Sequence, residues 1–305
     1  MAILEQLKAS ESGSDAFNFF TIDLEDWFHA NYQGAPVRRN RSTVEADTHV
    51  LLDLLEQHDA KATFFCLGQV AQAHRPLIKA IHAQKHEIAS HGFDHLLAYS
   101  QTPNEFKEDV YRCKAFLEDL IGTPVIGYRA PSWSIVTSTL WALEVLEELG
   151  FAYDSSIFPT KTPLYGISHA PRFPYVPRIA GRTLKLIEFP PATYRILGIN
   201  IGIAGGFYLR ILPLALQIAW AHSLNRQGHR LMCYIHPREI NPAQPRLELS
   251  PRDTFVHYYG IGTCADKIGA LLRSFRFVTL KAAVKDYPGA DLQSFDLSPC
   301  DVGKR

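Results

Sequence analysis

Short apolar runs alternate along this chain with longer segments in which apolar residues recur at helical spacing. The short runs are rich in β-branched and aromatic residues, a composition typical of β-strands. Strands that alternate with helices indicate a parallel α/β fold, most simply a (β/α) barrel, complete or incomplete. The eight predicted strands are Phe17–Asp23, Ala62–Leu67, Glu87–His91, Val125–Ala130, Ala152–Ser155, Leu184–Phe189, Leu231–His236 and Phe277–Leu280.

Capping residues mark the expected starts of two helices. Pro103–Ile121 follows Thr102 and contains Glu105, and this pair predicts a capping box. The other predicted helices are Thr43–His58, with Ser42 and Glu45 as a second capping pair, Thr139–Leu149, Tyr208–Gln227 and Ala265–Ser274.

The overall composition limits the classes of function. The chain has 305 residues, of which 47% are hydrophobic and 20% charged, as in an ordinary globular protein. Lysines and arginines number 31, and so do aspartates and glutamates. A protein that binds nucleic acid or an anionic membrane normally has an excess of basic residues, so neither partner is expected.

Signals for export, membrane insertion and disulfide formation are weak. The first residues lack a basic stretch followed by an apolar run, so no secretory signal is expected. The longest apolar stretch, Ile196–Leu216, is interrupted by Asn200, Arg210 and Pro213, which argues against a membrane span. We therefore expect a soluble, cytoplasmic protein. The five cysteines show no C-x-x-C spacing, which favours reduced thiols over disulfides or a cysteine zinc site.

Polar residues suited to catalysis follow five of the predicted strands. Because the carboxyl ends of barrel strands meet on one face, we expect these side chains to converge there. Each residue alone has an ordinary explanation, such as a helix cap, a solvated loop residue or a structural ion pair. A set without function would require all of those explanations to hold at once. The residues are Asp23, Glu25 and Asp26 after the first strand, His91 and His95 after the third, Arg129 after the fourth, Asp154 after the fifth and His236 after the seventh.

This set of residue types is chemically coherent. Two neutral histidines and one carboxylate can bind Zn²⁺ or a similar divalent ion and leave positions for water and substrate. Such an ion lowers the pKa of bound water towards ~7 and polarises a carbonyl oxygen. A second carboxylate can accept the water's proton, an arginine can orient that carboxylate, and a histidine can protonate the leaving amine. Together these parts suit amide hydrolysis without a covalent intermediate.

Five short motifs occur in a fixed order: T-I-D-L-E-D, S-H-G-F-D-H, Y-R-A-P-S-W, D-S-S and Y-I-H-P. This series resembles the polysaccharide deacetylases, carbohydrate esterase family 4, from about Phe17 to His236. The resemblance implies a deformed (β/α) barrel of seven or eight parallel strands. It also implies an N-acetylated oligo- or polysaccharide substrate and a divalent metal, Zn²⁺ with Co²⁺ or Ni²⁺ as alternatives.

The same resemblance implies individual roles. A backbone N–H near Trp133 would help to stabilise the oxyanion. The implied roles are catalytic base for Asp23, orientation of that base for Arg129, general acid for His236, support of that acid for Asp154, substrate contact for Trp133 and Tyr128, and metal binding for His91, His95 and one carboxylate of the first motif.

The first motif departs from the family's usual pair of adjacent aspartates, because its acids are spaced D-L-E-D. Side chains alternate along a strand, so Asp23 and Glu25 point the same way and could serve as base and ligand. Asp26, the aspartate of the adjacent E-D pair, is the alternative ligand. A third assignment makes Glu25 the base and Asp26 the ligand.

The expected organisation is a short N-terminal segment (1–16), a deacetylase barrel (17–240), a C-terminal extension packed on the barrel (241–285) and a poorly ordered tail (286–305). The extension resembles a branch encoded beside bacterial exopolysaccharide export and exosortase loci. Two alternative functions are an allantoinase-like amide hydrolase acting on a small ureide and a non-catalytic carbohydrate-binding protein. The sugar and the oligomeric state are not predicted.

Overall fold

In the computed structural model, which describes residues 17–31, 41–160, 162, 165–287 and 292–298, one parallel sheet organises the chain. Its strands are β1 (Phe17–Leu24), β2 (Thr63–Cys66), β3 (Glu87–Ser90), β4 (Gly127–Tyr128), β5 (Tyr153–Asp154), β8 (Ile187–Glu188), β11 (Met232–Ile235) and β12 (Arg276–Val278).

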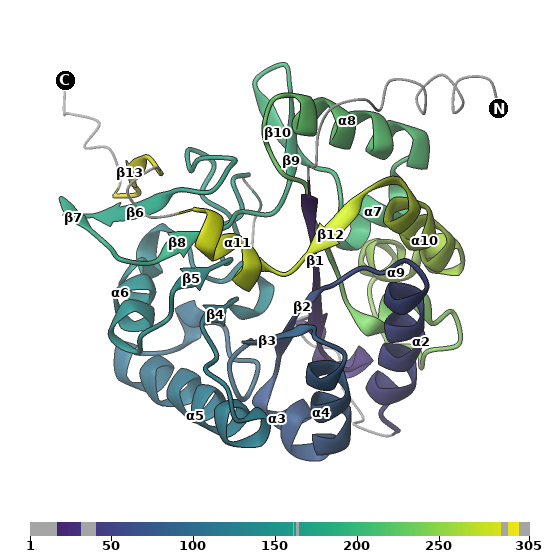
Figure 1. Cartoon of the computed structure of the whole chain (residues 1–305), viewed down its shortest axis with the longest axis horizontal. Helices are drawn as coiled ribbons and strands as arrows, with labels where there is room; N and C mark the ends of the chain where they lie inside the picture. Colours follow the sequence, from purple (N-terminus) through teal and green to yellow (C-terminus); the bar gives the residue numbers. More distant parts are fainter. Residues whose placement is uncertain (1–16, 32–40, 161, 163–164, 288–291, 299–305) are drawn as a thin grey trace.

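The strand order is β11-β1-β2-β3-β4-β5-β8, and β12 pairs with the first residues of β1. Helices surround this sheet (Figure 1). Among the described strands, no pair between β8 and β11 closes the barrel. The prediction of a deformed (β/α) barrel of seven or eight parallel strands is therefore confirmed.

Side-chain alternation along β1 separates the core from the barrel interior. Phe20, Ile22 and Leu24 belong to the largest apolar cluster, which includes the inner faces of the helices. Phe19 points into the barrel, where its ring packs edge-on against that of Phe189 with centroids 5.8 Å apart. Thr21 and Asp23 share the inward face of Phe19, so the interior becomes polar towards the carboxyl ends of the strands.

The helix predicted with the clearest capping signal is confirmed. Pro103–Ile121 forms α5, and its capping box joins Thr102 to Glu105 through reciprocal hydrogen bonds of 2.8 and 3.3 Å. No helix in the described residues is long and apolar enough to cross a membrane. The remaining helices are α2 (Val44–Gln57), α3 (Gly68–Ala73), α4 (Arg75–Ala83), α6 (Trp141–Glu148), α7 (Gly206–Ile211), α8 (Leu214–Arg226), α9 (Pro251–Tyr258), α10 (Cys264–Ser274) and α11 (Leu280–Asp286).

Two details of the helix predictions were wrong. Ser42 does not cap α2: Thr43 occupies that position, and its hydroxyl donates to Oδ2 of Asp47 at 2.8 Å. The helix predicted over Tyr208–Gln227 is divided into α7 and α8 at Pro213, which has no backbone N–H to donate and disfavours a helical residue before it.

The segment between β5 and α7 and the C-terminal tail contain strands that were not predicted. Part of the expected disordered tail forms β13, which pairs in parallel with β6 and is tied to it by Arg178 Nε and Asp296 Oδ2, 3.2 Å apart. Residues 288–291 and 299–305 of that tail lie outside the described residues. These strands are β6 (Val176–Ile179), β7 (Arg182–Thr183), β9 (Thr193–Ile196), β10 (Ile199–Gly202) and β13 (Ser294–Asp296).

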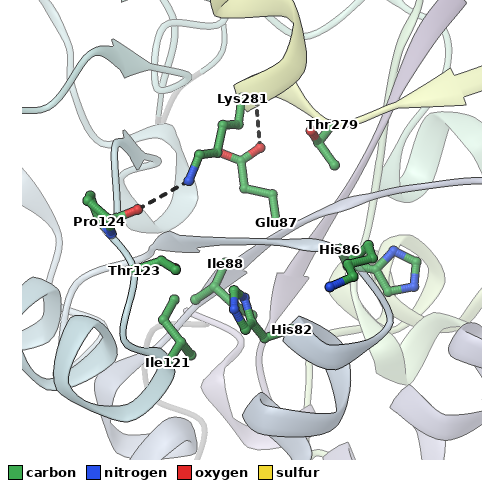
Figure 2. A pocket seen from close by; sticks show the side chains of 10 residues that line it. His82, His86, Glu87, Ile88, Ile121, Thr123, Pro124, Thr279 and Lys281 are labelled. Carbon is green, nitrogen blue, oxygen red and sulfur yellow. Dashed lines mark hydrogen bonds between the residues drawn. The ribbon is translucent and has the colours of Figure 1, made fainter.

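The amino-terminal end of β3 carries a buried carboxylate with a structural role. Glu87 accepts hydrogen bonds from Thr63 Oγ1 (2.7 Å), Tyr153 Oη (2.9 Å) and the backbone N–H of Lys281 (2.8 Å). Burial raises the pKa of Glu87 although these bonds oppose the rise. A small hollow of about 110 Å³ lies beside it (Figure 2). This network ties α11 to β2, β3 and β5 at the opposite end of β3 from His91.

Candidate metal and catalytic centre

Three side chains from the ends of β1 and β3 meet at one point. Oε1 of Glu25 lies 2.9 Å from Nε2 of His91 and 2.9 Å from Nε2 of His95. All three residues are almost fully buried, and their nearest ligand atoms lie within 4.8 Å of one another. Burial alone would raise the pKa of Glu25, but the nearby His95 and His236 and the hydrogen bonds with the two histidines hold it well below its ordinary value.

The loop after β3 has the shape needed to bring both histidines to Glu25. Gly92 has φ +76°, and a Cβ atom added there would lie 2.9 Å from Oδ2 of Asp109. The Asp109 carboxylate holds the loop by accepting the backbone N–H groups of Phe93 (2.8 Å) and Asp94 (3.1 Å). The chain then turns back at His95, which has φ +57°. The glycine within the H-x-x-x-H spacing therefore permits a tight loop rather than a helix.

The hydrogen bonds of His91 make its Nε2 atom suited to a cation. Its Nδ1 atom lies 2.7 Å from the carbonyl oxygen of Arg129, and a carbonyl can only accept, so Nδ1 carries the proton. In the neutral ring, Nε2 then presents a lone pair to the Glu25 carboxylate. Burial lowers the pKa of His91, but the bond with Glu25 and the charge of Asp23 raise it above its ordinary value. A second proton or a metal ion satisfies this arrangement, and the N, N, O donor set fits Zn²⁺ or a similar ion.

Asp23 lies beside this cluster, held by an arginine. Nη1 of Arg129 is 2.6 Å from Oδ1 of Asp23, and both side chains are buried. The guanidinium also donates to the hydroxyl of Thr21 (3.0 Å) and to the carbonyl (3.2 Å) and hydroxyl (3.0 Å) of Ser155. Four bonds fix its plane, so it orients the carboxylate of Asp23 and stabilises its charge. The other oxygen of Asp23, Oδ2, lies 4.0 Å from Nε2 of His236.

The carboxylate that contacts His236 is Glu239, a residue that the sequence analysis missed. Oε2 of Glu239 lies 3.3 Å from Nδ1 of His236 and accepts its backbone N–H at 3.0 Å. The contact forms because Pro237–Ile240 is a short 3₁₀ helix with His236 at its N-cap. Burial opposes the charge on Glu239, but Arg210, 2.9 Å away, and His236 hold its pKa far below its ordinary value. The signal available in the sequence was the capping-box spacing H-P-R-E.

Asp154, expected to support His236, has other partners. Its carboxylate accepts the hydroxyl (2.5 Å) and the backbone N–H (3.2 Å) of Ser156. It stands beside Glu188, its register partner on β8. Burial raises the pKa of Asp154 to about 6. Burial and the nearby charge of Asp154 also raise the pKa of Glu188 well above its ordinary value. Among the described contacts, Asp154 has none with His236, because its side chain lies beside Glu188 on the neighbouring strand β8.

The structure also separates the two candidate ligands of the first motif. Oδ1 of Asp26 accepts the backbone N–H groups of Trp27 (2.9 Å) and Thr43 (3.2 Å), so Asp26 caps the short 3₁₀ helix Trp27–His29. Glu25, which shares the strand face of Asp23, is the carboxylate beside the histidines. Strand alternation therefore places Glu25, and not Asp26, in the cluster.

The two residues expected to contact the substrate are both buried. Tyr128 is 1% exposed and packs edge-on against Phe106 and Phe151 in the core, because alternation on β4 turns Arg129 inward and Tyr128 outward. That expectation was wrong for Tyr128. Trp133 packs against Tyr234 with ring centroids 4.4 Å apart, and its backbone N–H donates to the carbonyl of Ala130 at 3.1 Å. The Trp133 amide is thus already engaged and does not point freely at an oxyanion.

Comparisons with known proteins divide the chain near β5. Residues 40–153 match the family model described as polysaccharide deacetylase, and residues 155–285 match a domain of unknown function, DUF3473. The first range includes His91, His95 and Arg129, and the second includes His236 and Glu239. Asp23 and Glu25 precede both ranges.

Curated relatives match the same part of the chain. A peptidoglycan-N-acetylglucosamine deacetylase of Bacillus cereus is 34% identical over 84 residues, which is 28% of this chain and 39% of that protein. A peptidoglycan deacetylase of Helicobacter pylori is 29% identical over 38% of this chain and 39% of its own length. A chitooligosaccharide deacetylase of Azorhizobium caulinodans is 25% identical over 33% of this chain and 54% of its length. The chain thus spans about two fifths of the first of these relatives.

A similar fold extends over nearly the whole chain. The crystal structure of a Mycobacterium smegmatis protein assigned to the polysaccharide deacetylases has a TM-score of 0.61 and 20% identity, and the match covers 93% of this chain and 95% of that one. Residues 40–153 thus form a region similar to the polysaccharide deacetylase family, within a fold that the Mycobacterium smegmatis protein shares over nearly the whole chain.

Proposed function

We propose that this chain is a metal-dependent hydrolase that removes N-acetyl groups from amino sugars of an oligo- or polysaccharide. The observation that carries the proposal is the meeting of Glu25, His91 and His95 beside the Asp23–Arg129 pair and His236. The deacetylase names of the relatives add support, since those names specify peptidoglycan and chitooligosaccharide substrates.

Glu25, His91 and His95 would hold the divalent ion, Zn²⁺ or alternatively Co²⁺ or Ni²⁺. When bound, such an ion supplies Lewis-acid chemistry that activates water and polarises the amide carbonyl. The protein prepares the site by burying the three side chains and by fixing the proton of His91 on Nδ1 through the carbonyl of Arg129.

Asp23 is the proposed base. Arg129 binds Oδ1, which leaves Oδ2 facing the space between the metal cluster and His236. A carboxylate held in this way can take the proton of an attacking water without moving, because its orientation is already fixed before substrate binds.

His236 is the proposed acid. Glu239 engages Nδ1 and so directs Nε2 towards Asp23, 4.0 Å from its Oδ2 atom. A proton on Nε2 can pass to the leaving amine as the tetrahedral intermediate collapses. Base and acid thus lie side by side next to the metal cluster, so that both can reach the amide of one bound substrate.

Acetate release tests this function against its alternatives. Purified protein is stripped of metal, reloaded with Zn²⁺, Co²⁺ or Ni²⁺, and incubated with N-acetylglucosamine oligomers or with allantoin. The proposal predicts metal-dependent release of acetate from the oligomers and no hydrolysis of the ureide. Hydrolysis of allantoin alone would indicate the small-substrate enzyme, and oligomer binding without acetate release would indicate a carbohydrate-binding protein.

Two finer points remain proposals. The C-terminal part, which resembles a branch from exopolysaccharide loci, suggests an exopolysaccharide or its precursor as the natural substrate, and deletion of the gene should then alter the acetylation of that polymer. The proposed location is the cytoplasm, which cell fractionation tests directly.

A further inference from the structure

The hairpin formed by β9 and β10 ends in an exposed apolar tip. Leu197 is 97% exposed, Ile199 66% and Ile196 37%. Leu197 has φ +48° and precedes Gly198 with φ +83°, so the turn holds a leucine in a conformation that normally favours glycine or asparagine. A polar turn would be more stable and more soluble here. The sequence instead places exposed aliphatic side chains at this turn.

A hollow lined by two arginines lies at the base of this hairpin. It measures about 330 Å³ and is lined by residues of the loop before β6, including Arg172 and His169, and by Arg195 and Asn200 of the hairpin. Arg172 donates to the carbonyl of Thr193 at 2.6 Å. Burial and the charge of Arg195 lower the pKa of Arg172. Within the described residues, neither arginine has a carboxylate within ion-pair distance, so an anion in the hollow would relieve their repulsion.

The segment around the hairpin has more basic than acidic residues although the chain as a whole is neutral. Residues 155–238 include ten lysines and arginines and a single acid, Glu188, which is fully buried. Arg178, Arg182 and Arg210 pair with carboxylates from elsewhere in the chain, whereas Arg172 and Arg195 have no such partner among the described residues. Equal totals over the whole chain predicted no anionic membrane partner. That expectation overlooks a local excess, because electrostatic attraction to a surface falls off within about 10 Å and depends on the charges nearest to it.

We propose that the β9–β10 hairpin docks this protein on an anionic phospholipid surface, with Leu197 and Ile199 inserted and Arg172 and Arg195 at the phosphates. The dimensions agree with this arrangement. Arg195 lies two residues before Leu197, about 7 Å along an extended strand. Interfacial apolar groups are buried roughly 5–10 Å into the boundary of headgroups and acyl chains, which places Arg195 at the headgroups. Arg172, bound to the carbonyl of Thr193, lies farther from the tip on the same side. Figure 1 shows the hairpin beside α8 at the edge of the molecule, where it can reach a flat surface.

A membrane suits this tip better than a second copy of the chain. Stable protein interfaces bury roughly 800 Å² on each partner and involve about 20–30 residues a side. The tip offers three aliphatic side chains, and Arg172 and Arg195 would repel the same arginines of another copy. An apolar point combined with nearby arginines is the two-part signal that gives reversible attachment to anionic lipid.

Co-sedimentation of the full chain with vesicles tests the proposal. Vesicles of phosphatidylcholine mixed with phosphatidylglycerol are compared with vesicles of phosphatidylcholine alone. The test variants are Leu197→Asn/Ile199→Thr, which preserves turn and strand preferences, and Arg195→Glu. The matched controls are Val50→Thr on α2 and Arg252→Glu on α9, both at exposed positions far along the chain from the hairpin.

Wild-type protein should sediment with the anionic vesicles and much less with the neutral ones. The tip variant should weaken binding by about tenfold and Arg195→Glu by about fivefold or more, whereas both controls bind as wild type. Equal binding by the tip variant would overturn the proposal. The proposal would also be overturned if the wild-type protein did not bind the vesicles, or if sedimentation velocity showed a dimer that the tip substitutions abolish. Because no deacetylation is measured, this result is independent of the proposed enzymatic function.

Discussion

Oε2 of Glu239 lies 3.3 Å from Nδ1 of His236 and accepts the backbone N–H of the same residue at 3.0 Å. Both ends of the Glu239 carboxylate are used, because Oε1 binds Arg210 at 2.9 Å. This contact sets which nitrogen of His236 faces Asp23. It replaces the contact that was expected from Asp154.

The first prediction concerns this contact. Glu239→Gln should lower kcat by about tenfold or more, because a misdirected or less basic His236 is a poorer proton donor to the leaving amine. KM should change less than kcat, and the limb of the pH–rate profile that reports the acid should shift. The matched control is Asp154→Asn, which should leave that limb in place. A shift with Asp154→Asn and none with Glu239→Gln would reverse the two roles.

The loop glycine between the metal-binding histidines gives a second prediction. Gly92→Ala should weaken metal binding and lower stability by about 1–3 kcal/mol, because it combines a positive φ with a clash against Asp109. Gly150→Ala is a closely matched control: that glycine also has φ +76°, but a Cβ there meets no atom within 4 Å.

Isothermal titration with Zn²⁺ and urea unfolding separate these two effects. The Gly150 variant should lose about 1 kcal/mol of stability from backbone strain and bind metal as wild type. Equal metal affinity in the Gly92 variant would show that the loop can shift without displacing His95.

A third prediction concerns the buried carboxyl pair Asp154 and Glu188. Oε2 of Glu188 is buried without a hydrogen-bond donor among the described groups, which a proton shared with Asp154 would resolve. The folded pair keeps a proton that the unfolded chain releases, so its contribution to the free energy of unfolding falls as the pH rises. For Asp154 the rise in pKa from 3.8 to about 6 corresponds to about 3 kcal/mol, lost between about pH 4 and pH 6.

Glu188→Gln replaces the shared proton by a permanent N–H donor. The stability of this variant relative to wild type should therefore increase from pH 4 to pH 8, as measured by urea unfolding at each pH. Glu56→Gln, at an exposed position on α2, should show no such trend. A difference between Glu188→Gln and wild type that does not change with pH would contradict the shared proton.

The sequence predicted the barrel and most of the candidate site because those features depend on local pattern. Short apolar runs located the eight strands of the sheet, and strand alternation from Asp23 placed Glu25 on the same face. The capping signal at Thr102 located α5 to the residue.

Features that depend on neighbours in space were missed. Glu239 reaches His236 only when Pro237–Ile240 folds as a 3₁₀ turn, and Asp154 turns away because Glu188 is its partner on the next strand. The β9–β10 hairpin was not predicted for another reason. The run I-L-G-I lacks the polar turn residues that normally identify a hairpin, and it was therefore considered only as a candidate membrane span.

The most direct test of the central claim is zinc-dependent acetate release from N-acetylglucosamine oligomers by wild type, Glu25→Gln and Asp26→Asn side by side. Wild type should release acetate only when metal is present. Glu25→Gln should lose about 100-fold or more, since it removes the negative ligand between the two histidines, while Asp26→Asn should retain most activity because its side chain only caps a turn. Loss of activity in Asp26→Asn with retention in Glu25→Gln, or no acetate release by wild type with any of the three metals, would contradict the account.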